Sequence, residues 1–243
     1  MNDTSGILWL ISARLGSKSI PDKNVKKLGG MPLLAYRIRS ALRIAKKNDV
    51  WISTDSRSYA RIAESFGARV PFLRPARLAS DSARSVDVAL HAMEWARRAG
   101  LSYRAIGLLE PTSPFVRTQH LKEALAKLFS DPSASSIIAT RRVSPGTFFI
   151  QRQTRYLSVI AKNMKKAGGV LRRQEEAGEI TPSGGFYISK WDAFLRLKSF
   201  YSDRALSFVL PDPYGLEIDE PMDWLWAEFL IREKIIRVRE LFR

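Results

Sequence analysis

The sequence has no cysteine, and its 243 residues include only two histidines, His91 and His120. Disulfides, thiolate metal sites and cysteine nucleophiles are therefore excluded, and a metal site built from several histidines is not expected. No apolar run approaches the ~20 residues needed to cross a bilayer. The N-terminus also lacks the basic and then hydrophobic pattern of a secretion signal. We therefore expect a cytoplasmic protein without a membrane segment.

Acidic residues are outnumbered by basic ones. There are 24 Asp and Glu against 40 Lys and Arg, which gives a formal net charge of +16. Such a field favours anionic partners: nucleotides, acidic sugars, nucleic acid or an anionic membrane. The cations are spread along the chain, and no basic module with interleaved aromatic residues, typical of RNA binding, is visible. We therefore expect a small anionic ligand, with nucleic-acid binding as the alternative.

Two common nucleotide motifs are also missing, since the chain has neither a Walker A loop nor GxGxxG. What it has is SARLGSKSIPDKN, residues 12–24, after an apolar run that predicts a buried strand. Gly16 lets backbone N–H groups approach an anion, and cations can neutralise it. The cations of this loop are Arg14, Lys18 and Lys23. The loop is a candidate polyphosphate site; the alternative is a solvated basic turn after an edge strand.

Strand-like and helix-like segments alternate along most of the chain. Strands are predicted at Ile7–Ser12, Val50–Ser53, Arg69–Leu73, Ala105–Leu109 and Ser136–Thr140. Helices are predicted from Leu33 after Pro32, over Arg57–Phe66 and Ser85–Arg98, and from a Thr118 cap to Phe129. This alternation predicts a single α/β domain over residues 1–243, with a mainly parallel sheet.

Between residues 144 and 183 the chain becomes rich in Arg, Lys, Gly and Gln and loses its periodicity. We predict an excursion from the main domain here, with short strands at Phe148–Arg152 and Tyr156–Ile160 and a strand led by Gly184 after it. The stretch is too polar to pack on the main core. We therefore expect it to join two copies of the chain in a homodimer.

The last part of the chain, residues 221–241, predicts a strong amphipathic helix. Its apolar stripe would consist of Met222, Leu225, Trp226, Phe229 and Leu230. We expect this stripe to face the core.

Five motifs, taken together, carry a family resemblance. Beside residues 12–24 they are LRPARLASDSARS at 73–85, LLEPTSPFVRT at 108–118, RRQ at 172–174 leading to TPSGGFYI at 181–188, and LEIDEPMDW at 216–224. With Ser53-Thr54-Asp55, their order and spacing resemble the acylneuraminate cytidylyltransferases, or CMP-sialic acid synthetases, including relatives acting on legionaminic and pseudaminic acids. The resemblance implies a Rossmann-like α/β fold with a small dimerisation insert, which corresponds to the excursion.

The resemblance also implies which residues hold the nucleotide. They are Arg14, Gly16, Lys18, Lys23 and Asn24 in the first loop, and Arg74, Ala83 and Ser85 in the segment that recognises cytosine. The cations would neutralise the triphosphate and orient its α-phosphorus for in-line attack. The alternative for residues 73–85 is an ordinary loop and helix start, in which Asp81 and Ser82 cap the helix.

The acidic motif Glu217-Ile218-Asp219 is the metal candidate, where relatives usually have Asp-x-Asp. Alternation along an extended segment puts both carboxylates on one face and Ile218 on the core side. Two hard oxygen ligands plus triphosphate oxygens suit Mg²⁺. The alternative is an acidic cluster that favours the N-terminus of the final helix, made of Asp219, Glu220 and Asp223. Both interpretations are compatible.

The sugar side departs from the family pattern. The resemblance places Glu110, Thr112, Ser113 and Arg173 beside the sugar. Glu110 stands where most relatives have glutamine, and Ser183 stands where they have asparagine. Glutamate adds a negative charge and removes two donors. That change is unfavourable beside a sugar carboxylate and favourable beside a cationic or donor-rich substituent.

The sequence therefore predicts a Mg²⁺-dependent nucleotidyltransferase with Arg14, Lys23 and Asp219 as its catalytic candidates. It would join a nine-carbon, sialic acid-like 2-keto sugar acid to the α-phosphate of CTP and release pyrophosphate. No residue stands out as a general base. The alternatives are another nucleotide such as GTP, another sugar acid, or a non-catalytic basic protein that binds nucleotides or acidic glycans.

Overall fold

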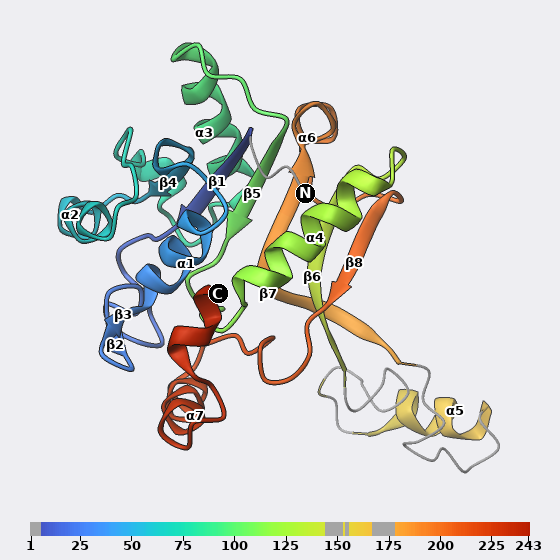
Figure 1. Ribbon diagram of the computed structural model, residues 1–243. Coiled ribbons are helices and arrows are strands. Elements are labelled where there is room, and N and C mark those ends of the chain that lie inside the picture. Colours follow the sequence, from blue (N-terminus) through green and yellow to red (C-terminus); the bar gives the residue numbers. More distant parts are fainter. Residues whose placement is uncertain (1–5, 144–152, 154–155, 167–177) are drawn as a thin grey trace.

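A six-stranded sheet forms the centre of the computed structural model, which describes residues 6–143, 153, 156–166 and 178–243 (Figure 1). Its strand order is β4-β1-β5-β7-β6-β8. The strands are β1 (Ile7–Ser12), β4 (Val50–Ser53), β5 (Ala105–Leu109), β6 (Ser136–Arg142), β7 (Ile180–Lys190) and β8 (Ala205–Val209). All neighbours pair in parallel except β7, which runs antiparallel to β5 and β6. The predicted α/β fold with a mainly parallel sheet is confirmed.

Helices cover both faces of this sheet. The apolar side chains of β1 alternate, so Ile7, Trp9 and Ile11 pack on one side and Leu8 and Leu10 on the other. The first core includes α1 (Leu33–Leu42), α2 (Arg57–Ser65), α4 (Thr118–Ser130) and α7 (Pro221–Arg232). The second includes α3 (Ser85–Arg98) and α6 (Trp191–Leu197). A small ribbon of β2 (Lys27–Leu28) and β3 (Met31–Pro32) precedes α1.

Glycine at position 107 sets the close packing at the centre of the sheet. Gly107 of β5 lies opposite Trp9 of β1. A Cβ at Gly107 would lie 2.5 Å from the Trp9 ring. The indole can therefore lie flat against β5 only because no side chain is present there. This contact belongs to the two strands whose carboxyl ends flank the candidate site.

Four predicted elements have the observed bounds: β1, β4, β5 and α3. The predicted strand Arg69–Leu73 is wrong, because only isolated bridges form at its two ends, Trp51 to Arg69 and Thr54 to Leu73. Pro71 between them lacks the N–H that a ladder needs. The Thr118 cap is also wrong, since Thr118 is the first residue of α4. The elements β8 and α6 were not predicted.

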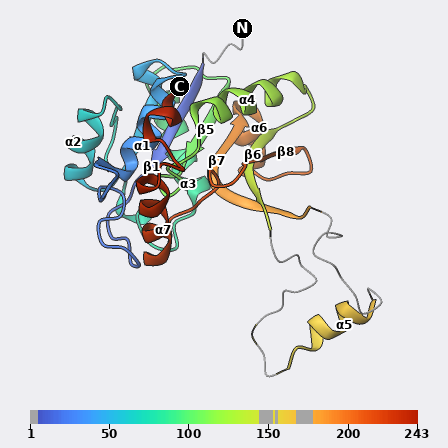
Figure 2. The ribbon, with the colours of Figure 1, turned by 60° about the horizontal axis from the view of Figure 1, so that its bottom comes forward.

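The excursion differs from its prediction where it is described. Residues 156–160 do not form a strand, because a helix, α5 (Ser158–Lys166), begins there. The predicted strand Phe148–Arg152 lies outside the described residues. Helix α5 stands apart from the sheet in both ribbon views (Figures 1 and 2) and has no buried residue. Apolar side chains at its start are exposed, namely Tyr156, Leu157 and Val159. None of the helices in the described ranges is long and apolar enough to span a membrane.

The final helix is shorter than predicted, and its buried face is only partly the predicted one. It ends at Arg232, and a 3₁₀ turn (Val238–Phe242) follows. Met222, Leu225 and Trp226 are 71%, 58% and 48% exposed, whereas Trp224, Ala227 and Leu230 are buried. The predicted stripe is therefore wrong for Met222, Leu225 and Trp226 and correct for Leu230, while Phe229 is half-buried. Apolar residues occur on both faces of α7, so periodicity alone could not select the buried one.

Candidate functional site

The candidate site lies at the topological switch point of the sheet. β4 and β5 lie on opposite sides of β1, so a crevice opens at the carboxyl ends of β1 and β5, the usual ligand position in such sheets. A cavity of about 350 Å³ occupies this position. Ten predicted site residues line it: Arg14, Lys18, Lys23, Asn24, Arg74, Ala83, Ser85, Glu110, Thr112 and Asp219. It also contains Ser12, Ser17, Ser19, Leu78, Ser80, Asp81, Val88, Pro111 and Glu220.

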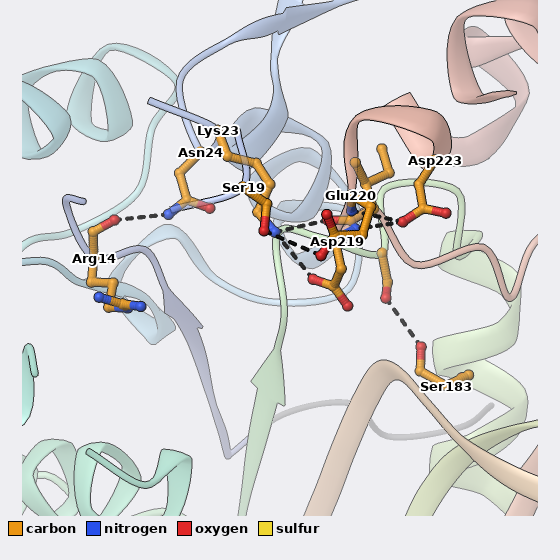
Figure 3. Close-up of polar contacts among 10 residues, drawn as sticks. Arg14, Ser19, Lys23, Asn24, Ser183, Asp219, Glu220 and Asp223 are labelled. Carbon is orange, nitrogen blue, oxygen red and sulfur yellow. Dashed lines mark hydrogen bonds and ion pairs between the residues drawn. The ribbon is translucent and has the colours of Figure 1, made fainter. Parts of the chain in front are cut away.

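The conformation of the loop after β1 is fixed by hydrogen bonds between its backbone and two side chains. Gly16 has φ +80°, a conformation that favours glycine, while open space surrounds its Cβ position. The Leu15 N–H donates to Asp55 Oδ1 at 2.8 Å. Asn24 Nδ2 donates to the Arg14 carbonyl at 2.9 Å (Figure 3). These bonds fix the loop and leave its cationic side chains directed to the cavity.

Asp81 is a cavity residue whose role the sequence did not reveal. Its carboxylate accepts from Arg14 Nη2 at 2.7 Å and lies 2.6 Å from Lys18 Nζ. These two partners hold the pKa of Asp81 below its ordinary value. The helix α3 begins at Ser85 after Arg84, so the suggested cap at Asp81 and Ser82 is not observed. Asp81 instead joins the cationic loop to the opposite rim of the cavity.

Lys23 connects the cationic loop to the acidic motif. Its Nζ donates to the Ile218 carbonyl at 2.8 Å and to Asp219 Oδ1 at 3.1 Å (Figure 3). The Lys23 side chain is 11% exposed, whereas that of Asp219 is 60% exposed. Ile218 is fully buried, as alternation predicted. An ammonium group and a carboxylate are therefore held together at the mouth of the cavity.

The acidic residues next to Asp219 serve the helix. Asp223 Oδ2 accepts the backbone N–H groups of Asp219 and Glu220, at 2.9 and 2.8 Å, and Glu220 is the N-cap of α7. The alternative interpretation of the acidic cluster thus holds for Glu220 and Asp223. It does not compete with a ligand role for Asp219, whose side chain points to Lys23 (Figure 3).

Glu217 lies behind Asp219, outside the cavity lining, against the backbone of β7. Gly184 has φ +65°, and a Cβ at that position would collide with the Glu217 carboxylate. Burial, and then the charge of Asp219, raise the pKa of Glu217. Within the described ranges, no cluster of three or more Asp, Glu or His side chains forms a ready metal site. The two carboxylates nevertheless have the hard oxygen donors that Mg²⁺ takes when phosphate oxygens complete its shell.

Arg74 forms the floor of the cavity on the side of β4. Its Nε donates to Ser53 Oγ at 2.9 Å and its Nη2 to Ser12 Oγ at 2.8 Å. Burial lowers its pKa to about 10, so the guanidinium remains charged at neutral pH. Arg74 therefore fixes the ends of β1 and β4 and presents a positive charge beside Ala83 and Ser85.

Glu110 follows β5 and faces the same cavity. Its Oε1 accepts from Ser85 Oγ at a long 3.4 Å, and no lysine or arginine of the described ranges forms an ion pair with it. Burial, and then the charge of Glu217, raise its pKa to about 7. The carboxyl group thus stands between Ser85 and the acidic motif, and the charge of Arg74 offsets only part of the rise in its pKa.

Comparison with known proteins supports the family. The family model described as cytidylyltransferase matches residues 8–179. The chain belongs to the cytidylyltransferase family. It is 31% identical over 230 residues to an N-acylneuraminate cytidylyltransferase of Escherichia coli O18:K1:H7, covering 94% of this chain and 52% of that protein. The chain thus spans about half the length of that relative.

Other relatives match over nearly their whole length. A pseudaminic acid cytidylyltransferase of Campylobacter jejuni is 29% identical over 93% of this chain and 96% of its own. A solved structure of a CMP:2-keto-3-deoxy-manno-octonic acid synthetase, complexed with CTP, superposes with a TM-score of 0.67 at 17% identity. It covers 95% of this chain and 100% of that one. The family resemblance and the Rossmann-like fold predicted from the sequence are confirmed.

Three predicted site residues of the described ranges do not line the cavity of this cytidylyltransferase family member, namely Gly16, Ser113 and Glu217. Gly16 lies in the loop after β1, and Glu217 lies behind Asp219, as described above. Ser113 is buried, and its Oγ donates to the Ser183 carbonyl at 3.2 Å (Figure 3). Arg173 lies outside the described residues. The roles of all four in binding remain predictions.

We predict that Glu110→Gln stabilises the protein at high pH. Because the folded-state pKa lies above the ordinary 4.5, the folded state binds the proton more tightly, and stability falls as pH rises from that value to about 7. Glutamine cannot ionise. Denaturant unfolding should show the variant gaining about 2 kcal/mol relative to wild type at about pH 8 compared with about pH 5.

A matched control is Glu94→Gln on α3. Two arginines hold the pKa of Glu94 at about 2, so its ion pairs exist at both pH values and its loss brings no gain at pH 8. An equal gain for both variants would show that the effect does not come from the buried Glu110 carboxyl.

Proposed function

We propose that this chain activates a nine-carbon, sialic acid-like 2-keto sugar acid with CTP, giving the CMP-sugar and pyrophosphate. The observation that carries the proposal is the charge pattern of one cavity. Arg14, Lys18 and Lys23 provide positive charge for a triphosphate, and Asp219 with Glu217 behind it provides carboxylates for a divalent cation. These groups lie at the topological switch point of a nucleotide-binding type of sheet.

The nucleoside would occupy the side of the cavity near α3. Leu78 and Val88 give an apolar surface there for a base, and Ala83, Ser85 and Arg74 supply polar groups. The loop with Gly16 offers backbone N–H groups to the phosphates. The α-phosphorus would then lie near Lys23, the residue that reaches both the loop and the acidic motif.

Glu217 and Asp219 would hold Mg²⁺ together with phosphate oxygens. The ion would neutralise the charge that develops on the departing pyrophosphate. Lys23 orients Asp219 through its 3.1 Å contact and adds a second positive charge at the same place. The sugar acid would enter beside Glu110 and Thr112, with Arg173 assigned to its anionic group. We propose that the reaction takes place in the cytoplasm.

The test is pyrophosphate release with CTP and with GTP, each combined with a panel of sugar acids. The panel should contain N-acetylneuraminate and an amino-substituted nine-carbon acid, because Glu110 favours a cationic or donor-rich substituent. Release that needs CTP, a sugar acid and Mg²⁺ together is expected. Tight CTP binding by calorimetry without turnover for any sugar acid would instead identify a nucleotide-binding protein without this activity.

We also propose that the excursion at 144–183 makes a homodimer. One supporting observation is the position of α5 apart from the sheet (Figure 2). Another is the exposure of Tyr156, Leu157 and Val159 at its start. Apolar side chains of this size gain by burial in an interface. Sedimentation at micromolar concentration is expected to give twice the chain mass. A monomer under those conditions would contradict the prediction.

A further inference from the structure

Arg37 is a buried cation that the proposed chemistry does not use. It lies in α1 with 0% of its surface exposed, and no carboxylate of the described chain forms an ion pair with it. Burial lowers its pKa to about 9, so it stays charged at neutral pH. A buried charge without a counter-ion costs several kcal/mol. A guanidinium retained at such a cost points to a task that an apolar side chain could not perform.

The guanidinium bridges two segments that flank the candidate site. Nη1 donates to the Val116 carbonyl at 3.0 Å, in the loop after β5, and Nη2 to the Gly185 carbonyl at 3.5 Å in β7. Gly185 lies at a register shift between β6 and β7. Residue 138 of β6 pairs with residue 187 of β7 and residue 140 pairs with residue 182, so residues 183–186 face a single residue of β6. The extra residues form a β-bulge, and their backbone groups need hydrogen-bond partners outside the ladder. Arg37 supplies one.

The bulge at 183–186 also contacts residues near the candidate site. Ser113 Oγ donates to the Ser183 carbonyl of the bulge. The loop that holds Ser113 is joined to the acidic motif, because the Ile218 N–H donates to the Thr112 carbonyl at 2.8 Å. Gly184 forms the surface on which the Glu217 carboxylate rests. The position of the bulge therefore sets the position of Glu217 and of the loop after Glu110.

We propose that Arg37 is a positioning residue. From the α1 face of the sheet it fixes the β7 bulge, and through the bulge it fixes the seat of Glu217 and the sugar-facing side of the cavity. Only the kinetic consequence rests on the proposed function. The structural consequence, a bulge held by one guanidinium, can be measured without any substrate.

The experiment compares Arg37→Met, Arg37→Lys and a control, Arg39→Met, on the exposed side of the same helix. In the methionine variant, amide hydrogen exchange at 183–186 should rise about tenfold or more while β1 keeps its protection. At a temperature well below the melting temperature, kcat/KM for the sugar acid should fall by about tenfold to a hundredfold. A displacement of the sugar-facing residues by about 1 Å is enough for such a loss. The KM for CTP should change less than kcat/KM for the sugar acid, because Lys23 and the cationic loop do not contact the bulge. Lysine should give an intermediate result, and the Arg39 variant should match wild type.

Unchanged exchange at 183–186 in the methionine variant would overturn the proposal. So would faster exchange throughout β1 with an equal loss toward CTP and sugar, which would mean that Arg37 serves folding alone. Should the methionine variant not fold, the lysine variant decides by the same two measurements. A wild-type protein without turnover would contradict the proposed function, while exchange at the bulge would still decide the role of Arg37.

Discussion

Replacing Asp219 with asparagine is expected to lower turnover of CTP by about a hundredfold or more. The amide keeps the size of the side chain but removes the charge that would hold a divalent cation, a term of several kcal/mol. The backbone around position 219 should not move, because its N–H is held by Asp223 rather than by its own side chain. The measurement is pyrophosphate release as a function of Mg²⁺ concentration.

Two companion variants sharpen this test. Glu217→Asp should retain part of the activity, because it keeps a carboxylate on the same segment. Asp203→Asn removes an exposed carboxylate that does not line the cavity and should behave as wild type. Full wild-type activity in excess chelator would show that the acidic motif does not act through a metal.

Lys23→Met is expected to lower kcat/KM for CTP by about a hundredfold, a loss of about 3 kcal/mol. Methionine preserves the length of the aliphatic stem but loses the bonds to Ile218 and Asp219 and the charge that we propose lies beside the α-phosphate. Because Lys23 is 11% exposed, water cannot replace the lost ammonium group well. Steady-state kinetics with CTP as the varied substrate measure the effect.

The neighbouring Lys27 provides the control. It is exposed on β2 and does not line the cavity, so Lys27→Met removes the same charge from the same part of the chain. It should leave kcat/KM within about twofold of wild type. If both lysine variants lost activity equally, the overall positive field, and not the contact of Lys23, would account for nucleotide binding.

The sheet could be predicted from the sequence where a buried strand is a short apolar run with clear ends. Ile7–Ser12 and Ala105–Leu109 are of this kind, and the site motifs at 12–24 and 108–118 could be found because each begins at the end of one of these strands. The alternation in Glu217-Ile218-Asp219 correctly placed Ile218 in the core. These are local signals, which a single sequence carries well.

What could not be predicted depends on contacts between distant segments. Lys23 meets Ile218 across 195 positions of the chain, and Arg14 meets Asp81 across 67. Nothing local to Asp81 indicates that its partners are cations of the first loop. The buried face of α7 is likewise chosen by its neighbours: Lys26 lies 4.3 Å from the centre of the Trp224 ring, and a helix apolar on both faces gives no sign of that choice.

The antiparallel direction of β7 has a consequence for how this architecture can change over evolutionary time. Arg142 and Ile180 are ladder partners, and the Val143 N–H donates to the Glu179 carbonyl at 2.9 Å, so the excursion leaves and rejoins the domain at one point. Its entrance and exit are already closed into a hairpin, and each doubling of a flexible insert then adds only about 0.6 kcal/mol of closure entropy. The segment between them can be lengthened, shortened or exchanged while the catalytic scaffold keeps its register. The proposed subunit association and the proposed chemistry can therefore diversify independently in this chain.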